Sequence, residues 1–252
     1  MRKIRSALTA CSAAIILFGC SEDPSPGEKL TQAVHQAKQG NWEAAERTAA
    51  ELSEKSPKSI APMLLAALAY ERKGDLDKAL DLARQCALSE NDDFAAQYTF
   101  GRLSAKNPLR YSEAFAILER ALTLKPGDTD TLVLLCNLGT QLKHPDTGKY
   151  LAQLQNDPEI SKSAHFFYQL GLNQAEKKNG RAAVEYLWRA VRLGGPRNPE
   201  LILNAARCID NGGFSPKDAI SLYQFYINHP AKKETAKLQE ATARVRELRS
   251  GK

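Results

Sequence analysis

Apolar residues recur every three or four positions over most of the chain, which is the spacing of one face of an α-helix. Ala45, Ala49 and Leu52 show this spacing, and so do segments in the middle and at the end of the chain. No segment shows the strict alternation of apolar and polar residues that is typical of a β-strand. From Lys29 onward the pattern therefore predicts paired amphipathic helices and an all-α fold.

The expected turns and helices recur at a fixed distance. Gly40 and Gly74 lie 34 residues apart, and Ala45 and Ala79 follow them in step. A period of 34 residues is typical of helix–turn–helix units that stack into a solenoid. A single unit cannot bury its apolar face alone, so neighbouring units must cover it and one long surface stays free for binding.

The third unit carries the most complete motif. A bulky residue precedes a glycine, an alanine follows, and a large residue, a second alanine and a proline come four, seven and twelve positions later: Phe100, Gly101, Ala114, Leu118, Ala121 and Pro126. This pattern resembles the tetratricopeptide repeat (TPR) motif. The fifth and sixth units repeat much of it, with Leu170, Gly171, Ala183, Leu187, Ala190 and Pro196, and with Ala219, Tyr223, Tyr226 and Pro230.

The resemblance implies an all-α, right-handed α-solenoid of about six TPR-type repeats over residues 29–252. Leu238, Ala241, Val245 and Leu248 recur at helical spacing after the last repeat, which predicts a C-terminal capping helix from about residue 231.

The fourth unit departs from the motif. Gly148 stands near the position of the first alanine, and His144-Pro145-Asp146 occupies the turn. Pro145 has two interpretations, an ordinary turn between two helices or a local irregularity that re-aims the solenoid.

The amino-terminal segment has the pattern of a secretory signal. Arg2, Lys3 and Arg5 precede a short apolar run that ends at Cys20. A cysteine that follows leucine, a variable residue and glycine resembles the lipobox of bacterial lipoproteins, in which this cysteine is acylated. We therefore predict a signal peptide over residues 1–19, lipidation of Cys20 and a tether over residues 20–28. The alternative is a secreted protein that is cut elsewhere.

Cleavage would lower the net charge of the chain from +6 to +3, so the sequence does not favour nucleic-acid binding. Residues 232–252 contain seven basic and three acidic side chains. This basic segment is interpreted as a solvated capping helix or as a contact for anionic lipid or an acidic partner. Cys86, Cys136 and Cys208 remain as an odd number of thiols, and we predict that they are buried and free.

The sequence contains no constellation that indicates an enzyme. His35, His144, His165 and His229 lack a paired zinc-binding spacing, and no G-x-S-x-G motif occurs. Gly148-Lys149 is not a phosphate-binding loop, because the glycine five positions earlier is missing and Tyr150 follows. We expect no catalysis, no cofactor, no metal and no small-molecule substrate.

In solenoids of this family the first helix of each pair lines the concave surface. The resemblance therefore implies a groove that binds a protein or peptide partner, lined by Leu64, Leu68, Tyr98, Arg102, Val133, Asn137, Tyr168, Leu172 and Asn204. Leu30, Val34, Arg207 and Cys208 occupy equivalent positions. The alternative for the aliphatic members is that they pack in the core.

These features predict a lipid-anchored adaptor or scaffold in the cell envelope, at the outer membrane and facing the periplasm. Six-repeat TPR lipoproteins resemble pilotins, and shorter ones resemble the lipoprotein of the β-barrel assembly complex. An assembly factor for an outer-membrane machine is therefore one alternative, and a self-associating structural lipoprotein is another.

Overall fold

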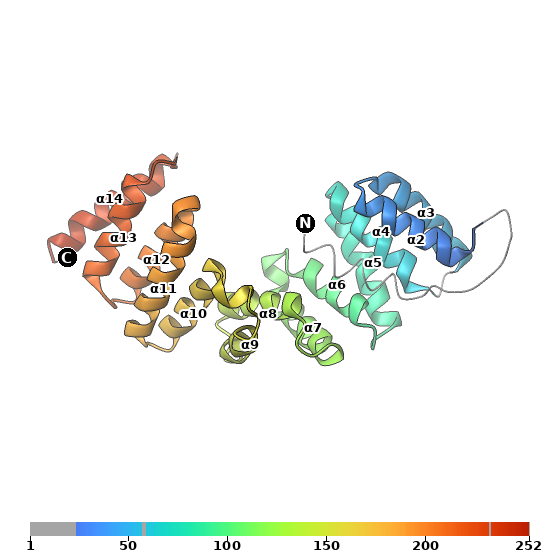
Figure 1. The fold of residues 1–252 in the computed structure, drawn as a ribbon, viewed down its shortest axis with the longest axis horizontal. Helices are drawn as coiled ribbons and strands as arrows, with labels where there is room; N and C mark the ends of the chain where they lie inside the picture. The colour runs from blue at the N-terminus through green and yellow to red at the C-terminus, as the bar shows by residue number, and fades with distance from the viewer. Residues whose placement is uncertain (1–23, 57–58, 232, 252) are drawn as a thin grey trace. The chain divides into compact units, whose positions relative to one another are not determined.

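The computed structural model describes residues 24–56, 59–231 and 233–251. The predicted signal peptide and Cys20 lie outside these residues. The described residues form helices and no strand (Figure 1). The α-helices are α2 (Pro26–Lys38), α3 (Trp42–Lys55), α4 (Ile60–Lys73), α5 (Leu76–Ser89), α6 (Phe94–Ser104), α7 (Tyr111–Leu124), α8 (Thr129–Leu142), α9 (Thr147–Leu154), α10 (Ala164–Glu176), α11 (Gly180–Gly194), α12 (Pro199–Asn211), α13 (Pro216–Asn228) and α14 (Thr235–Arg249).

The helices follow one another as six pairs and a final single helix, which confirms the predicted all-α solenoid of TPR-type repeats with its cap. The chain divides into two compact units, Met1–Leu138 and Gly139–Lys252, called unit 1 and unit 2 below. In unit 1, α2 packs on α3, α4 on α5 and α6 on α7. In unit 2, α10 packs on α11, α12 on α13, and α13 on α14.

Local sequence signals explain where the helices begin and end. Gly40 and Gly74 have φ values of 91° and 87°, a left-handed conformation that favours glycine. Asn41 and Asp75 follow them, and their side chains accept hydrogen bonds from the first turns of α3 and α5. The glycine-plus-cap pair therefore makes each of these two turns compact.

Small residues let the helices of a repeat approach each other closely. A Cβ atom on Gly101 would lie 2.8 Å from Leu118 Cγ, and one on Gly171 would lie 2.7 Å from Leu187 Cγ. Five alanines at repeating positions of the motif are fully buried: Ala45, Ala79, Ala114, Ala183 and Ala219. The motif residues thus serve helix packing in both units.

Two boundaries differ from the expectation. Helix α2 begins at Pro26, inside the predicted tether, because Ser25 and Glu28 form a capping box that extends the helix toward the amino end. The cap helix α14 begins at Thr235, four residues later than expected, and it buries Ala241 and Val245 against unit 2 as predicted.

The fourth repeat is irregular, as the sequence indicates. Lys143 has a φ of 53°, which is unusual for a residue with a side chain. Its second helix, α9, has only 8 residues and is followed by a 3₁₀ turn over Ile160–Lys162. Gly148 lies in the first turn of α9.

Candidate partner-binding surfaces

Three of the predicted groove residues lie in the core of unit 1. The exposed fractions of Leu64, Leu68 and Tyr98 are 4%, 3% and 1%. Leu64 and Leu68 belong to clusters of buried alanines and leucines. The prediction that these three side chains line an open groove is therefore wrong. The alternative that the leucines pack between adjacent repeats is the one that the structure supports.

Arg102 is partly buried and forms an ion pair with α4. Its two terminal nitrogens donate hydrogen bonds of 2.7 and 2.6 Å to the two carboxylate oxygens of Glu71. Lys106 Nζ lies 2.6 Å from the same carboxylate. Burial alone would raise the pKa of Glu71, but the hydrogen bonds and charges of Arg102 and Lys106 lower it overall. Arg102 thus ties α6 to α4, and its charge is balanced within unit 1.

The other predicted residue positions are partly exposed. Val133 and Asn137 lie on α8, Tyr168 and Leu172 on α10, and Asn204 on α12. Tyr168 and Cys208 both pack at the edge of the main core cluster of unit 2. Burial raises the pKa of Tyr168, and it raises the pKa of the free Cys208 thiol to about 11. Leu172, Asn204 and Cys208 therefore give the first helices of unit 2 a mixed apolar and amide surface.

Cys86 and Cys136 are buried and form no disulfide, as predicted, whereas Cys208 is only partly buried. Burial raises the pKa of Cys136 to about 12, so its thiol stays protonated at neutral pH.

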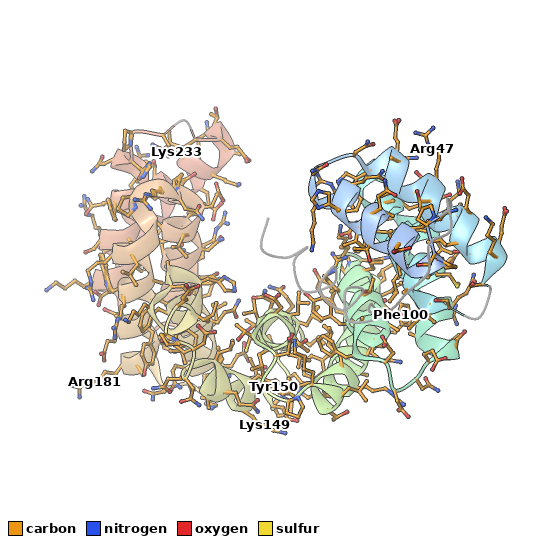
Figure 2. The ribbon with its side chains drawn as sticks, turned by 45° about the vertical axis from the view of Figure 1, so that its right-hand side comes forward. Arg47, Phe100, Lys149, Tyr150, Arg181 and Lys233 are labelled. Atoms are coloured by element: carbon orange, nitrogen blue, oxygen red, sulfur yellow. The ribbon has the colours of Figure 1, made fainter. Side chains whose placement is uncertain are left out.

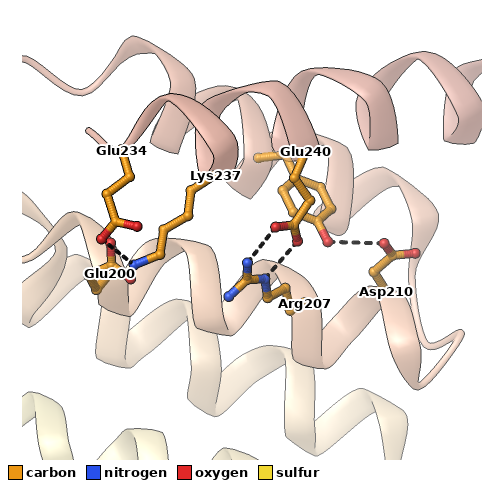
Figure 3. A network of polar contacts seen from close by, with 7 residues as sticks. Glu200, Arg207, Asp210, Glu234, Lys237 and Glu240 are labelled. Carbon is orange, nitrogen blue, oxygen red and sulfur yellow. Dashed lines mark hydrogen bonds and ion pairs between the residues drawn. The ribbon is translucent and has the colours of Figure 1, made fainter. Parts of the chain in front are cut away.

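The cap helix is held by a polar network that the sequence did not reveal (Figure 3). Arg207 donates hydrogen bonds of 2.8 and 2.6 Å to the Glu240 carboxylate. Lys237 Nζ lies 3.1 Å from Glu200 and 3.0 Å from Glu234. These contacts connect α14 with α12, so part of the basic C-terminal segment is paired inside unit 2.

Asp210 is the most buried carboxylate of this network, with 6% of its side chain exposed. It accepts hydrogen bonds from Arg244 at 2.9 and 2.8 Å and from the Tyr223 hydroxyl at 3.0 Å. The Arg244 hydrogen bonds, together with Tyr223, lower the pKa of Asp210 below its ordinary value. Opposite charges about one repeat apart, such as Asp210 and Arg244, are the sequence signal that could have indicated these pairs.

No described helix is long and apolar enough to cross a membrane. In the same part of the chain, no three His, Cys, Asp or Glu residues converge in a way that could hold a metal ion.

Comparison with known proteins shows likeness in structure without likeness in sequence. No protein-family model matches the chain. No curated protein matches its sequence. Many solved structures share its fold. A tetratricopeptide repeat protein from Parabacteroides merdae ATCC 43184 has a TM-score of 0.66 and 15% identity, covering 90% of this chain and 87% of that protein.

PilW, described as a widely conserved type IV pilus biogenesis factor, has a TM-score of 0.65 and 17% identity, covering 87% of this chain and 99% of its own. YrrB, described as a TPR protein with an unusual peptide-binding site, has a TM-score of 0.61 and 16% identity, covering 77% of this chain and 97% of its own. The fold of this chain is therefore that of the TPR proteins.

Proposed function

We propose that this protein is a lipid-anchored, non-enzymatic adaptor whose first-helix surface binds a protein or peptide partner in the cell envelope. The observation that carries the adaptor role is the pair of adjacent first helices α10 and α12, which carry the partly exposed Leu172 and Asn204. Apolar and amide groups on neighbouring helices suit an extended peptide or an amphipathic helix. The likeness to YrrB supports this use of the fold.

The partner surface can be tested by replacing leucine with arginine at two positions, one on the proposed surface and one outside it. Leu172→Arg places a long charged side chain on the proposed surface, whereas Leu193→Arg places it on α11, where Leu193 is 51% exposed. We expect Leu172→Arg to abolish site-specific crosslinking of the partner from position 204, and Leu193→Arg to leave it unchanged. Equal crosslinking in both variants would contradict the proposed surface.

The anchor rests on the pattern around Cys20. A protein held by an acyl chain on this residue would be an envelope lipoprotein, and we place it at the outer membrane facing the periplasm. Cys20→Ser should abolish metabolic labelling of the protein with a fatty acid and release it from the membrane fraction. Continued labelling would contradict the anchor without affecting the adaptor proposal.

A role in assembling an outer-membrane machine is the second candidate. It is favoured by the likeness to PilW, which extends over 99% of that protein. A deletion strain should then lose surface pili and the inserted secretin oligomer, and the wild-type gene should restore both. Normal piliation in the deletion strain would exclude this candidate and leave the general adaptor role in place.

A further inference from the structure

A polar cavity lies beside the irregular turn of the fourth repeat, entirely within unit 2. Its volume is about 200 Å³. It is bordered by the end of α8, by the turn and first residue of α9, and by the end of α10: Gly139, Thr140, Lys143, His144, Pro145, Thr147, Asn173, Glu176 and Lys177.

Two cations border the cavity, and one of them lies at an unfavourable place for a cation. A Cβ atom on Gly148 would lie 3.1 Å from Lys177 Nζ. Gly148 is in the first turn of α9, where the helix dipole places partial positive charge. An anion between the ammonium group and the start of the helix would stabilise both positive charges.

Glu176 also borders the cavity, 3.6 Å from Lys143 Nζ. The two side chains are 46% and 72% exposed, so this ion pair is weak and open to competition. With Lys177 included, the cavity keeps one net positive charge.

Asn173 is a buried polar group whose side chain has no hydrogen bond within the described chain. It is 9% exposed and borders the cavity. Its amide lies close to Gly148, since a Cβ atom there would be 3.4 Å from Asn173 Oδ1 and 3.9 Å from Nδ2. A buried amide is stabilised by a hydrogen-bond partner, and a ligand in the cavity can supply one.

The start of α9 also leaves a donor available. The N-cap residue Asp146 makes no side-chain hydrogen bond to this helix, whereas Asn179 caps α11 in the next repeat. Thr147 and Lys149 donate their backbone N–H groups to His144 and Asp146. The N–H of Gly148 has no backbone acceptor among the described residues, and the side-chain atoms closest to a Cβ placed on Gly148 are Lys177 Nζ and the amide of Asn173.

We propose that this cavity binds a phosphoryl group, held by the Gly148 N–H, the Asn173 amide and the ammonium groups of Lys143 and Lys177. Backbone N–H groups at a helix start, together with lysine, are a common way to bind phosphate. The group comes either from free phosphate or from a phospholipid headgroup. This proposal does not rest on the proposed partner surface, which is argued from Leu172 and Asn204.

The direct test is an amide NMR titration of the full chain with sodium phosphate, with ionic strength held constant by sodium chloride. We expect saturable shifts of the Gly148 amide and the Asn173 side-chain amide. Asn173→Asp keeps the shape of the side chain and adds a negative charge, so it should weaken phosphate binding by more than about tenfold. Absence of saturable shifts in the wild type would overturn the proposal.

Lys149→Gln is the matched control, because Lys149 is an exposed cation in the same helix turn (Figure 2). Lys149 does not border the cavity. Lys177→Gln should weaken binding by about tenfold, and Lys149→Gln by less than about threefold. Equal losses in the two variants would mean diffuse attraction to positive charge and would contradict the cavity site. Thermal melts followed by circular dichroism establish that each variant is folded.

The source of the phosphoryl group is distinguished with vesicles of phosphatidylglycerol and of phosphatidylcholine. A headgroup ligand predicts binding to phosphatidylglycerol vesicles that is weakened by Asn173→Asp and by free phosphate. Saturable phosphate binding without vesicle binding assigns the site to a soluble phosphate. Vesicle binding that Asn173→Asp leaves unchanged would exclude the headgroup source.

Discussion

Units 1 and 2 build the same helix pair from different residues. In the two described core clusters of unit 1, eleven of eighteen buried residues are alanine, whereas in the cluster of unit 2 four of thirteen are. Unit 2 instead buries residues such as Ile202, Leu203 and Tyr226. Unit 1 therefore depends on close approach of helix backbones, and unit 2 depends more on burial of large side chains.

The two units also differ in charge. Residues 24–138 contain 14 basic and 16 acidic side chains, and residues 139–252 contain 18 basic and 11 acidic ones. Unit 2 thus has an excess of basic side chains. Three of its basic side chains, Lys237, Arg207 and Arg244, are paired with carboxylates. The comparison indicates that the same repeat fold forms with very different balances of charge.

The largest expected effect is loss of a large side chain from the core of unit 2. Ile202 is fully buried, so Ile202→Ala removes three carbon atoms and leaves a cavity. We expect the free energy of unfolding to fall by about 2–5 kcal/mol, measured by urea denaturation. A much smaller loss would mean that the stability of unit 2 does not depend on large side chains. It would contradict the proposed difference between the cores of the two units.

The complementary change enlarges a residue in unit 1. Ala79 is fully buried where two helices approach closely, so Ala79→Leu should destabilise the protein by about 1–3 kcal/mol through overpacking. The same denaturation experiment measures it. Ala50→Leu, at an exposed position of α3, is the control and should be nearly neutral. A neutral Ala79→Leu would contradict the close packing of unit 1.

The attachment of the cap in unit 2 gives a smaller effect. Asp210→Asn weakens the contacts with Arg244 and Tyr223, and we expect a cost of about 1–2 kcal/mol. The pair formed by Arg207 and Glu240 is 33% and 42% exposed, so Arg207→Ala should cost less than about 1 kcal/mol. Hydrogen exchange of α14 amides measures both. If Arg207→Ala cost more stability than Asp210→Asn, the pair of Arg207 and Glu240 would be the stronger attachment of α14.

The smallest effect is a dependence of stability on pH, which both units share. The pKa values of Glu71 in unit 1 and Asp210 in unit 2 are lower than their ordinary values of 4.5 and 3.8. Their stabilisation is therefore complete above these unfolded values and is lost as the pH falls through the lower folded values.

We expect a constant melting temperature between neutral pH and about pH 5, and a decline below about pH 4. The decline should be less steep in Asp210→Asn, because one of the groups that bind a proton on unfolding has been removed. An unchanged slope in this variant would mean that Asp210 does not contribute to acid sensitivity.

The sequence predicts the helix pairs well because their signals are local. Gly40 and Gly74 end helices because glycine readily adopts a positive φ. Small residues at fixed positions of the repeat, such as Ala79 and Gly101, indicate where two helices pack closely. The cap helix was predicted for the same reason, since the spacing of Leu238, Ala241 and Val245 is visible within one helix.

The surface was predicted less well because exposure depends on the neighbouring repeat. Tyr98 and Leu64 occupy the groove positions implied by the motif, yet adjacent helices bury them. Arg102 was expected to contact a partner, and Glu71, 31 residues earlier in the chain, already pairs with it. A motif specifies the position of a residue within its own repeat and says nothing about the charge that the next repeat places beside it.

Helix α14 has a consequence for assembly. Its inner side carries Ala241 and Val245, and its outward positions include the exposed Gln239, Arg246 and Arg249. A further repeat could stack there only by removing these side chains from water without an apolar surface in return. The outer side of α14 is therefore unfavourable for stacking, and copies of this protein are not expected to join end to end into a filament through α14.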